Sequence, residues 1–231
     1  MQQSGNAAAT RRALYGRSKG KALRAHHAQL VDERLPGLEV DPATLRSGAP
    51  LFPFEPRDMW LEIGFGGGEH LIAQARAHPD VGLIGCEPFV NGVAKALAAA
   101  ELYGVDNLRL RAGDARALIE ALPPATLSRI FILYPDPWPK RRHNKRRLIS
   151  DEMIAEFARV ARSGAELRFA TDIDDYAGWA LRRFLESSAF QWKAQTADDW
   201  RAPWEGWSPT RYEVKARRAG RPSAYLTFVR R

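Results

Sequence analysis

Short apolar runs alternate with amphipathic stretches through the middle of the chain, and this alternation predicts strands followed by helices. Apolar runs with the length of buried strands lie at residues 59–63, 81–86, 107–112, 128–134 and 166–170. Helical patterns lie at residues 69–77, 89–103, 115–122, 150–162 and 174–186. Strands that alternate with helices in this way predict a mostly parallel sheet with helices on both faces.

The last part of the chain breaks this alternation. Residues 190–196 and 224–230 are two more strand-like runs, with a long loop and no convincing helical pattern between them. Two strands joined in this way favour an antiparallel pairing. We therefore expect an α/β fold, with a mostly parallel seven-stranded sheet, an antiparallel end strand and helices on both faces.

Residues 1–50 differ from the rest and are predicted to form a basic N-terminal extension that is partly flexible. Residues 1–24 hold six basic side chains and no acid, which suits either a disordered arm or an arm that settles on RNA. Residues 22–34 could form a short helix, ended by Pro36 and Gly37. The domain proper is expected to comprise residues 51–231.

Composition narrows the classes of function. The net charge of +8 favours an anionic partner, most often nucleic acid, and six of the cations lie within residues 140–147. A single cysteine, Cys86, cannot form an internal disulfide, and no zinc-site spacing is present. No apolar run approaches the ~20 residues that a membrane span needs. We expect a cytoplasmic protein without a metal, acting as a monomer or homodimer without an obligate protein partner.

A glycine-rich turn, Gly64-Phe65-Gly66-Gly67-Gly68, joins the first predicted strand to the first helix and follows the acid Glu62. Glycines at such a turn let a ligand lie close against the backbone. Dinucleotide enzymes use G-x-G-x-x-G, whose third glycine would fall where Glu69 stands. A glutamate at that helix entrance would repel a pyrophosphate. The pattern therefore indicates a ligand without phosphate, such as S-adenosylmethionine.

Two more acids stand at the ends of the next two predicted strands. Glu87 lies 19 residues beyond Gly68, close to the ~20 expected for an acid that bonds ribose hydroxyls. Asp114 could accept from an adenine amino group, or it could cap the following helix. Because strand ends converge on one crevice of a parallel sheet, we expect both acids beside the glycine turn.

The segment after the fourth strand combines an acid, an aromatic ring and a cationic run. Asp136 lies between two prolines, which fix its backbone before a substrate arrives. An adenine amine would need a base, whereas guanine N7 already exposes a lone pair. An acid there can bond the donor groups of guanine and stabilise the developing positive charge. Trp138 either stacks on a base or packs the loop.

The run from Lys140 to Arg147 is the strongest signal for nucleic acid, since lysine and arginine contact phosphates; its alternative is a solvated basic loop. Asp172, at the end of the fifth strand, either faces the same crevice or caps the next helix. Residues 208–213, by their spacing alone, look like an ordinary loop.

Taken together, these segments resemble the bacterial tRNA (guanine-N7-)-methyltransferase family, which has the class I methyltransferase (Rossmann-like) fold. The resemblance covers roughly residues 55–231. It rests on Leu61-Glu62-Ile63-Gly64-Phe65-Gly66, Cys86-Glu87-Pro88, Gly113-Asp114-Ala115, Tyr134-Pro135-Asp136-Pro137-Trp138-Pro139-Lys140, Arg142-His143-Asn144-Lys145-Arg146-Arg147, Ala170-Thr171-Asp172 and Thr210-Arg211-Tyr212-Glu213.

The resemblance implies transfer of a methyl group from S-adenosylmethionine to N7 of a guanine in the tRNA variable loop. It implies a donor site at Glu62, Gly64, Gly66, Gly68, Glu87, Asp114 and Asp136, with Asp136 also catalytic. It implies substrate contacts from Lys140, Asp172, Thr210, Arg211, Tyr212 and Glu213, and RNA contacts from Arg142, His143, Asn144, Lys145, Arg146 and Arg147.

Two other functions stay open on the sequence alone. One is an amino-group methyltransferase of the same fold acting on adenine, whose usual motif is Asp/Asn-Pro-Pro-aromatic. Here Trp138 follows Asp136-Pro137, so the second proline is missing. The other is a non-catalytic RNA-binding module that keeps the fold but not the methyl donor. The intact set of acids, Glu62, Glu87, Asp114 and Asp136, argues against such a decayed site.

Overall fold

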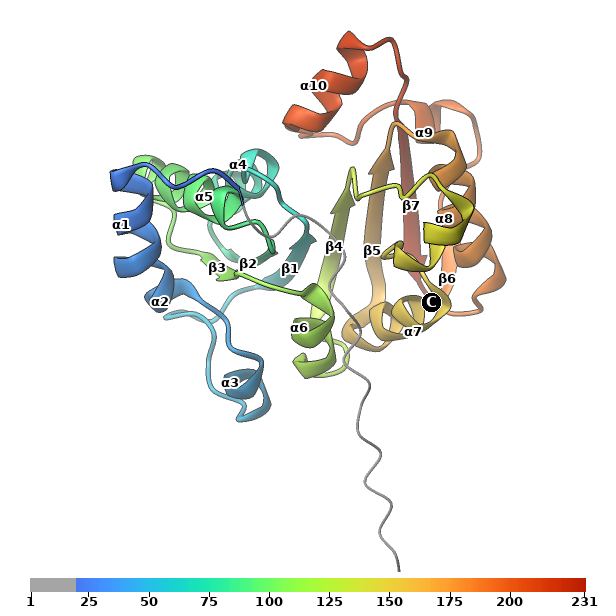
Figure 1. Ribbon diagram of the computed structural model, residues 1–231. Coiled ribbons are helices and arrows are strands. Elements are labelled where there is room, and N and C mark those ends of the chain that lie inside the picture. The colour runs from blue at the N-terminus through green and yellow to red at the C-terminus, as the bar shows by residue number, and fades with distance from the viewer. Residues whose placement is uncertain (1–19) are drawn as a thin grey trace, which may run out of the picture.

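A seven-stranded sheet between two layers of helices forms the body of the protein in the computed structural model, which describes residues 20–231 (Figure 1). The strands are β1 (Asp58–Ile63), β2 (Val81–Cys86), β3 (Leu108–Arg111), β4 (Leu127–Leu133), β5 (Ala161–Thr171), β6 (Phe190–Trp192) and β7 (Ala224–Arg230). The helices are α1 (Ala25–Glu33), α2 (Leu35–Leu38), α3 (Pro42–Arg46), α4 (Glu69–Ala77), α5 (Val90–Tyr103), α6 (Ala115–Ala121), the 3₁₀ helix η1 (Arg141–Arg146), α7 (Asp151–Val160), α8 (Asp174–Glu186), α9 (Asp198–Arg201) and α10 (Arg211–Arg218).

The strand order is β3-β2-β1-β4-β5-β7-β6. The first five strands in this order are parallel to one another, and β7 runs antiparallel to both β5 and β6. The predicted fold, a mostly parallel seven-stranded sheet closed by an antiparallel element, is therefore confirmed. The antiparallel strand is not at the edge, however, because β7 lies between β5 and the three-residue edge strand β6.

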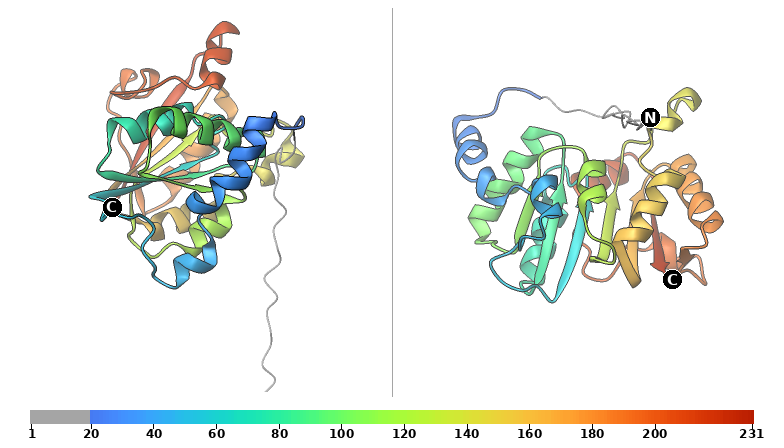
Figure 2. Two further views of the ribbon diagram at one scale, coloured as in Figure 1. Left: turned by 90° about the vertical axis from the view of Figure 1, so that its left-hand side faces the viewer. Right: turned by 90° about the horizontal axis from the view of Figure 1, so that it is seen from below.

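Each face of the sheet carries its own hydrophobic core. On one face, side chains of α6, α7 and α8 pack against the sheet around Ile130, Phe157 and Phe169. On the other, side chains of α1, α4 and α5 pack around Leu83 and Phe131. Figure 2 shows the helices on both sides of the sheet. Because β1 to β5 are parallel, they end together at one edge of the sheet, where the loops that follow them can meet.

The N-terminal extension is part of the folded body over much of its described length. Leu30, Leu35, Val40 and Leu45 are all buried, and they pack beside the sheet with α5 and α6. Pro36 and Gly37, predicted to end a helix, lie instead inside α2, because proline is tolerated in the first turn of a helix. Most of the arm predicted to be disordered or RNA-binding, residues 1–19, lies outside the described residues.

Two further elements differ from the sequence prediction. The helix predicted to run to residue 162 ends at Val160, and Gly164, predicted to stop it, lies inside the long strand β5. The loop predicted at residues 208–213 leads into α10, a helix of 8 residues whose first residue is Arg211. Over residues 20–231, no helix combines the length and the apolar character that crossing a membrane requires.

Candidate active site

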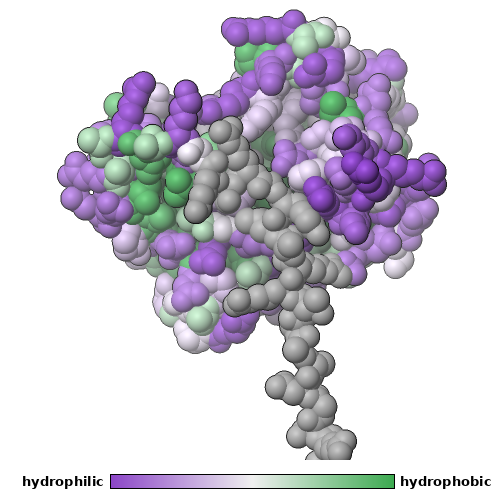
Figure 3. All heavy atoms as spheres, in the orientation of Figure 1, coloured by the Kyte–Doolittle hydropathy of each residue, from purple (hydrophilic) through white to green (hydrophobic). Residues whose placement is uncertain are grey.

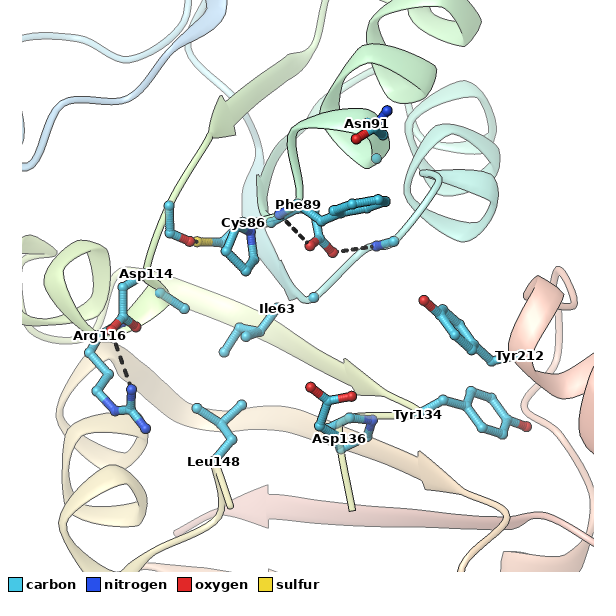
Figure 4. A pocket seen from close by; sticks show the side chains of 18 of the residues that line it. Ile63, Cys86, Phe89, Asn91, Asp114, Arg116, Tyr134, Asp136, Leu148 and Tyr212 are labelled. Atoms are coloured by element: carbon cyan, nitrogen blue, oxygen red, sulfur yellow. Dashed lines mark hydrogen bonds and ion pairs between the residues drawn. The ribbon is translucent and has the colours of Figure 1, made fainter. Parts of the chain in front are cut away.

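A pocket of about 280 Å³ opens where β1, β2, β3 and β4 end. The loops after these four strands line it, and Arg211 and Tyr212 of α10 complete its wall. In Figure 4, Asp114 and Arg116 lie at one end of the pocket, Tyr134 and Tyr212 at the other, and the Asp136 carboxyl points into the space between them. The strand-end acids Glu87, Asp114 and Asp136, predicted from separate parts of the sequence, thus share one cavity.

The glycine-rich turn owes its spacing to backbone conformation. Gly64, Gly66 and Gly68 have φ angles of 74°, 60° and 81°, a left-handed region that other residues rarely occupy. Every second residue of the turn therefore requires glycine, which explains the G-x-G-x-G pattern. Gly64 and Gly66 line the pocket. Gly68 does not; it lies at the start of α4, where a Cβ atom would stand 2.8 Å from the Cβ of Ala96.

Glu87 ties two loops together from inside the pocket. One carboxylate oxygen accepts from the Gly66 N–H and the other from the Phe89 N–H, both at 2.8 Å (Figure 4). Burial raises the pKa of Glu87, although these two backbone bonds oppose the shift. Each oxygen keeps lone-pair capacity for a further donor, so the side chain can hold the turn and still receive hydroxyl groups of a ligand.

Glu62 is placed differently from the prediction, because its side chain does not line the pocket. It is 3% exposed and lies behind the turn, where its carboxylate is 2.7 Å from Nδ1 of the buried His70. The His70 ring in turn contacts Phe131 and Trp207, with ring centroids 4.7 and 4.9 Å away. The structure therefore gives Glu62 a supporting place. The sequence prediction did not include His70. Its position as the second residue of α4, directly after the glycine turn, is the signal that could have indicated it.

Asp114 has one of the two roles that the sequence left open, helix capping, and its position in the pocket leaves the other available. It caps α6, since its side chain accepts from the backbone N–H of Arg116 at 3.0 Å. The Arg116 guanidinium also pairs with it at 3.3 Å, and both residues line the pocket. A carboxylate offers about four acceptor positions, so capping leaves room for a ligand donor.

Asp136 sits in a loop with an uncommon backbone. Tyr134 and Trp138, two residues before and after it, have φ angles of 51° and 44°. Non-glycine residues in this region cost about 1–3 kcal/mol each and persist where neighbours hold them. The Tyr134 hydroxyl donates to Ser223 Oγ at 2.8 Å. Asp136 is exposed towards the pocket, yet the surrounding protein atoms desolvate its carboxyl enough to raise its pKa.

The cationic run forms η1 at the rim of the pocket, and its residues do not all face solvent. Arg142 and Lys145 are exposed, whereas His143 and Arg146 pack on Trp138. The His143 ring centroid lies 6.1 Å from that of Trp138, and the Arg146 guanidinium lies 4.9 Å from it. Desolvation and the adjacent cations lower the pKa of His143. Trp138 therefore packs the loop and also lines the pocket.

Two residues of the run shape the loop instead of facing a ligand. In the amide orientation that suits its neighbours, Asn144 donates to the carbonyl oxygens of Trp138 and Lys140 at 3.1 and 3.3 Å. Arg147, predicted to contact RNA, is the largest fully buried side chain, and it has no exposed surface with which to reach a phosphate. This part of the prediction is wrong for Arg147, because its guanidinium lies between the rings of Tyr176 and Trp179.

Lys140 and Asp172, predicted to contact substrate, lie outside the pocket lining. Lys140 is exposed, at the start of η1. Asp172 is mostly buried and accepts from Nε of Arg221 at 2.7 Å. It does not cap α8, whose N-terminal cap position is Ile173. Asp172 therefore holds the segment that follows α10 against the end of β5.

The four predicted substrate residues of α10 divide into two pairs. Arg211 and Tyr212 line the pocket; Arg211 Nε donates to Glu69 at 2.7 Å, and a Cβ atom on Gly66 would lie 3.1 Å from the Tyr212 ring. Thr210 and Glu213 are buried and face the protein. Thr210 caps the helix by accepting from the Glu213 N–H at 3.2 Å. In their present positions, Thr210 and Glu213 orient the helix and contact no ligand space.

Glu213 is the anchor of α10. Its carboxylate is completely buried and accepts from Trp207 Nε1 and from the Tyr225 hydroxyl, both at 2.6 Å, and from Arg217. Trp207 and Tyr225 also pack with Trp204 in one aromatic cluster. Trp204 and Trp207 therefore help to seat α10 over the glycine turn. Over residues 20–231, no group of histidine, cysteine or acidic side chains is arranged to hold a metal.

The fold and the pocket define the class of protein first. The antibiotic-resistance methyltransferase Kmr shares the fold with a TM-score of 0.52 and 17% identity, over 83% of this chain and 94% of that one. The precorrin-6y C5,15-methyltransferase of Geobacter metallireducens does so with a TM-score of 0.54 and 13% identity, over 82% and 88%. This sheet order, with the glycine turn and acids at its carboxyl edge, is that of a class I methyltransferase.

The family follows from sequence relatives. Residues 56–226 match the model of a family described as "Putative methyltransferase". The tRNA (guanine-N(7)-)-methyltransferase of Bradyrhizobium diazoefficiens is 52% identical over 221 residues, 95% of this chain and 94% of that protein. That of Nitrobacter winogradskyi is 51% identical over 219 residues, 94% and 85%. The chain belongs to the tRNA (guanine-N(7)-)-methyltransferase family, as the motifs indicated.

Proposed function

We propose that this protein is an enzyme that transfers a methyl group from S-adenosylmethionine to N7 of a guanine in the variable loop of tRNA. One observation carries the proposal: in a chain of this family, Asp136 shares a single pocket with Glu87 and Asp114, and exposed cations border the opening. Donor site, acceptor site and RNA surface would then meet at the ends of four strands.

The residues that line the pocket fit this methyl donor. Gly64 and Gly66 have no side chain between their backbone and the pocket, so a ligand can lie against them. Glu87 can still accept from ribose hydroxyls, and Asp114 can accept from an amino group. Arg211, a cation beside the turn, is paired with Glu69 and so is not free to attract a phosphate there. Among the lining residues, the carboxylates of Glu87 and Asp136 are available to a cationic ligand, and S-adenosylmethionine supplies an electrophilic methyl group on a sulfonium centre.

Asp136 is the residue to which we assign the catalytic role. Guanine N7 needs no base to become a nucleophile, but the ring gains positive charge as it is methylated. A carboxylate within reach can accept from the N–H groups of guanine and stabilise that charge. Holding Asp136 rigidly avoids the cost of orienting it during the reaction. Because the pKa of Asp136 is raised, activity should be lost on acidification at a higher pH than the pKa of an ordinary aspartate would give.

The exposed cations Lys140, Arg142 and Lys145 at the pocket rim are assigned to the RNA backbone. Phosphate contacts position a nucleic acid and make its affinity depend on salt, without selecting a base. His143 and Arg146 would act through Trp138, against which they pack. Asn144 and Arg147 would shape the loop. The target guanine would have to leave its stack to reach Asp136, as bases do in enzymes that modify them.

The decisive experiment incubates the protein with labelled S-adenosylmethionine and unmodified tRNA, then maps the label by strand cleavage specific for N7-methylguanine. We expect label at one guanine of the variable loop. Label on adenine would support an amino-group methyltransferase instead, and absence of label together with absence of donor binding by calorimetry would support a non-catalytic RNA-binding module. Asp136→Ala should abolish transfer while the protein still binds tRNA.

A further inference from the structure

Helix α10 presents more positive charge than its anchoring requires. Residues 211–221 contain five cations and one acid. Three of the cations have acidic partners: Arg211 pairs with Glu69, Arg217 with Glu213, and Arg221 with Asp172. The remaining two are Lys215 and Arg218; both are exposed, and neither has an acidic partner within 4.0 Å among residues 20–231.

The free cations lie on one face of the helix. Glu213 and Ala216 are its buried residues and define the face towards the protein. Arg211, Lys215 and Arg218 follow one another at i, i+4 and i+7, so they form a stripe on roughly the opposite face. Seven residues of helix span about 10 Å. The stripe starts at Arg211, which lines the pocket, and leads away from it.

The placement of α10 suits a rigid contact surface. Figure 1 shows the helix beyond the carboxyl ends of the central strands, standing out from the rest of the chain. In Figure 3, drawn in the same orientation, hydrophilic side chains predominate at this end of the molecule, with a smaller hydrophobic patch among them. The three hydrogen bonds to the buried Glu213 carboxylate hold the helix in place, so the helix itself need not be ordered by the partner.

We propose that Lys215 and Arg218 on the outer face of α10 bind the sugar-phosphate backbone of tRNA, as a second cationic surface beside the one on η1. The pocket is lined on one side by the loop that leads into η1 and on another by α10. An RNA strand that contacts both surfaces is held on two sides of the opening, and one nucleotide between them can reach Asp136. This inference rests on the proposed function, because it assumes that tRNA is the substrate.

Salt dependence of tRNA binding tests the proposal. Unmodified tRNA is titrated with Lys215→Gln, Arg218→Gln and the double variant at several salt concentrations. Glutamine is about as good a helix former as lysine and arginine, so α10 should persist. The slope of log K against log salt is negative. Each lost phosphate contact should reduce its magnitude by about 0.7–0.9, and the double variant should reduce it by about 1.4–1.8. Thermal unfolding checks that the variants remain folded.

Arg46→Gln is the matched control. Arg46 is an exposed cation on α3, at the opposite end of the molecule from α10. It should keep the wild-type slope. Equal slopes for the double variant and the wild type would overturn the proposal, and so would an equal fall for Arg46→Gln, since the effect would then be one of net charge. A changed oligomeric state with unchanged tRNA affinity would assign α10 to a protein contact instead and would also overturn it.

The two proposals fail in distinguishable ways. If wild-type protein methylates guanine N7 in tRNA and the double variant binds tRNA normally, only the assignment of α10 is wrong. If the wild type neither binds nor methylates tRNA, the proposed function itself is wrong. Lys215→Glu adds a further check, because a reversed charge beside a phosphate should weaken binding more than Lys215→Gln does.

Discussion

Replacing Arg147 with alanine should mainly lower the free energy of unfolding, although the residue belongs to the cationic run 140–147, whose composition predicts RNA binding. Its side chain is fully buried, its Nε donates to the Pro137 carbonyl at 2.8 Å, and its guanidinium lies 4.8 and 4.9 Å from the ring centroids of Tyr176 and Trp179. Alanine would leave a cavity and an unbonded carbonyl where these contacts were.

The magnitude follows from these contacts. A hydrogen bond to a charged group contributes about 1.5–3 kcal/mol, and each cation–π contact about 0.5–2 kcal/mol. The ion pair with Asp175 adds little, because that carboxylate is 70% exposed. One Arg147 nitrogen, Nη1, is buried without a hydrogen-bond partner, which reduces the sum. We expect a loss of about 3 kcal/mol, in the lower part of the sum of these contributions.

Urea denaturation measures this loss, and Arg142→Ala is the matched control. With a slope of roughly 2–3 kcal/mol per M, the midpoint of Arg147→Ala should fall by about 1 M or more. Arg142 is exposed in the same run, so its variant should keep the midpoint while the salt slope of tRNA binding falls by about 0.7–0.9. The opposite result, a normal midpoint and a lower slope for Arg147→Ala, would refute the structural role.

Three further substitutions test the pocket. Asp136→Asn should abolish methyl transfer and raise the thermal midpoint of unfolding. The folded state raises the pKa of this acid, so its charged form disfavours folding above that pKa. A lower midpoint by calorimetry would contradict this. Gly92→Ala should weaken donor binding by tenfold or more, because the added methyl would overlap the Gly66 carbonyl oxygen; unchanged affinity by isothermal titration would exclude that contact. His70→Ala should destabilise the protein by about 2–4 kcal/mol in urea, since it leaves the buried Glu62 carboxylate without its partner, whereas His70→Gln should recover part of the loss.

Local patterns were sufficient to predict the sheet. The apolar run of β2 and the limits of α4 and α8 agree with the structure to the residue. Strands buried on both faces produce continuous apolar runs, and glycine or proline marks most of their ends. The strand-end acids could be predicted for the same reason, because the carboxyl ends of parallel strands meet at one edge.

α10 could not be predicted from periodicity, because only Glu213 and Ala216 of its residues are buried. Its stability comes from partners distant in sequence, such as Tyr225 and Glu69. A local signal did exist: Thr210 followed three residues later by a glutamate is the pattern of a capping box. Here the threonine does cap the helix, while the Glu213 side chain bonds Trp207 and Tyr225 instead.

The burial of Arg147 was beyond sequence reasoning for a different reason. A run of cations looks the same whether its last member faces water or the core. What decides its position is the pair of rings that α8 supplies, Tyr176 and Trp179, about thirty residues later. The hydroxyl of Tyr176 and the indole of Trp179 also bond the backbone at Ile149, so the end of the run is fixed against α8 on several sides.

These long-range contacts change the explanation of how Asp136 is held. Pro135 and Pro137 fix their own φ angles, and Pro137 also restricts the backbone of Asp136. They do not keep Tyr134 and Trp138 in the left-handed region. The cost of that backbone, about 1–3 kcal/mol for each residue, must be offset by contacts elsewhere. Ser223 accepts from Tyr134 at one end of the loop, and Arg147 donates to Pro137 at the other. The carboxylate to which we assign the catalytic role therefore depends on a buried arginine that does not line the pocket.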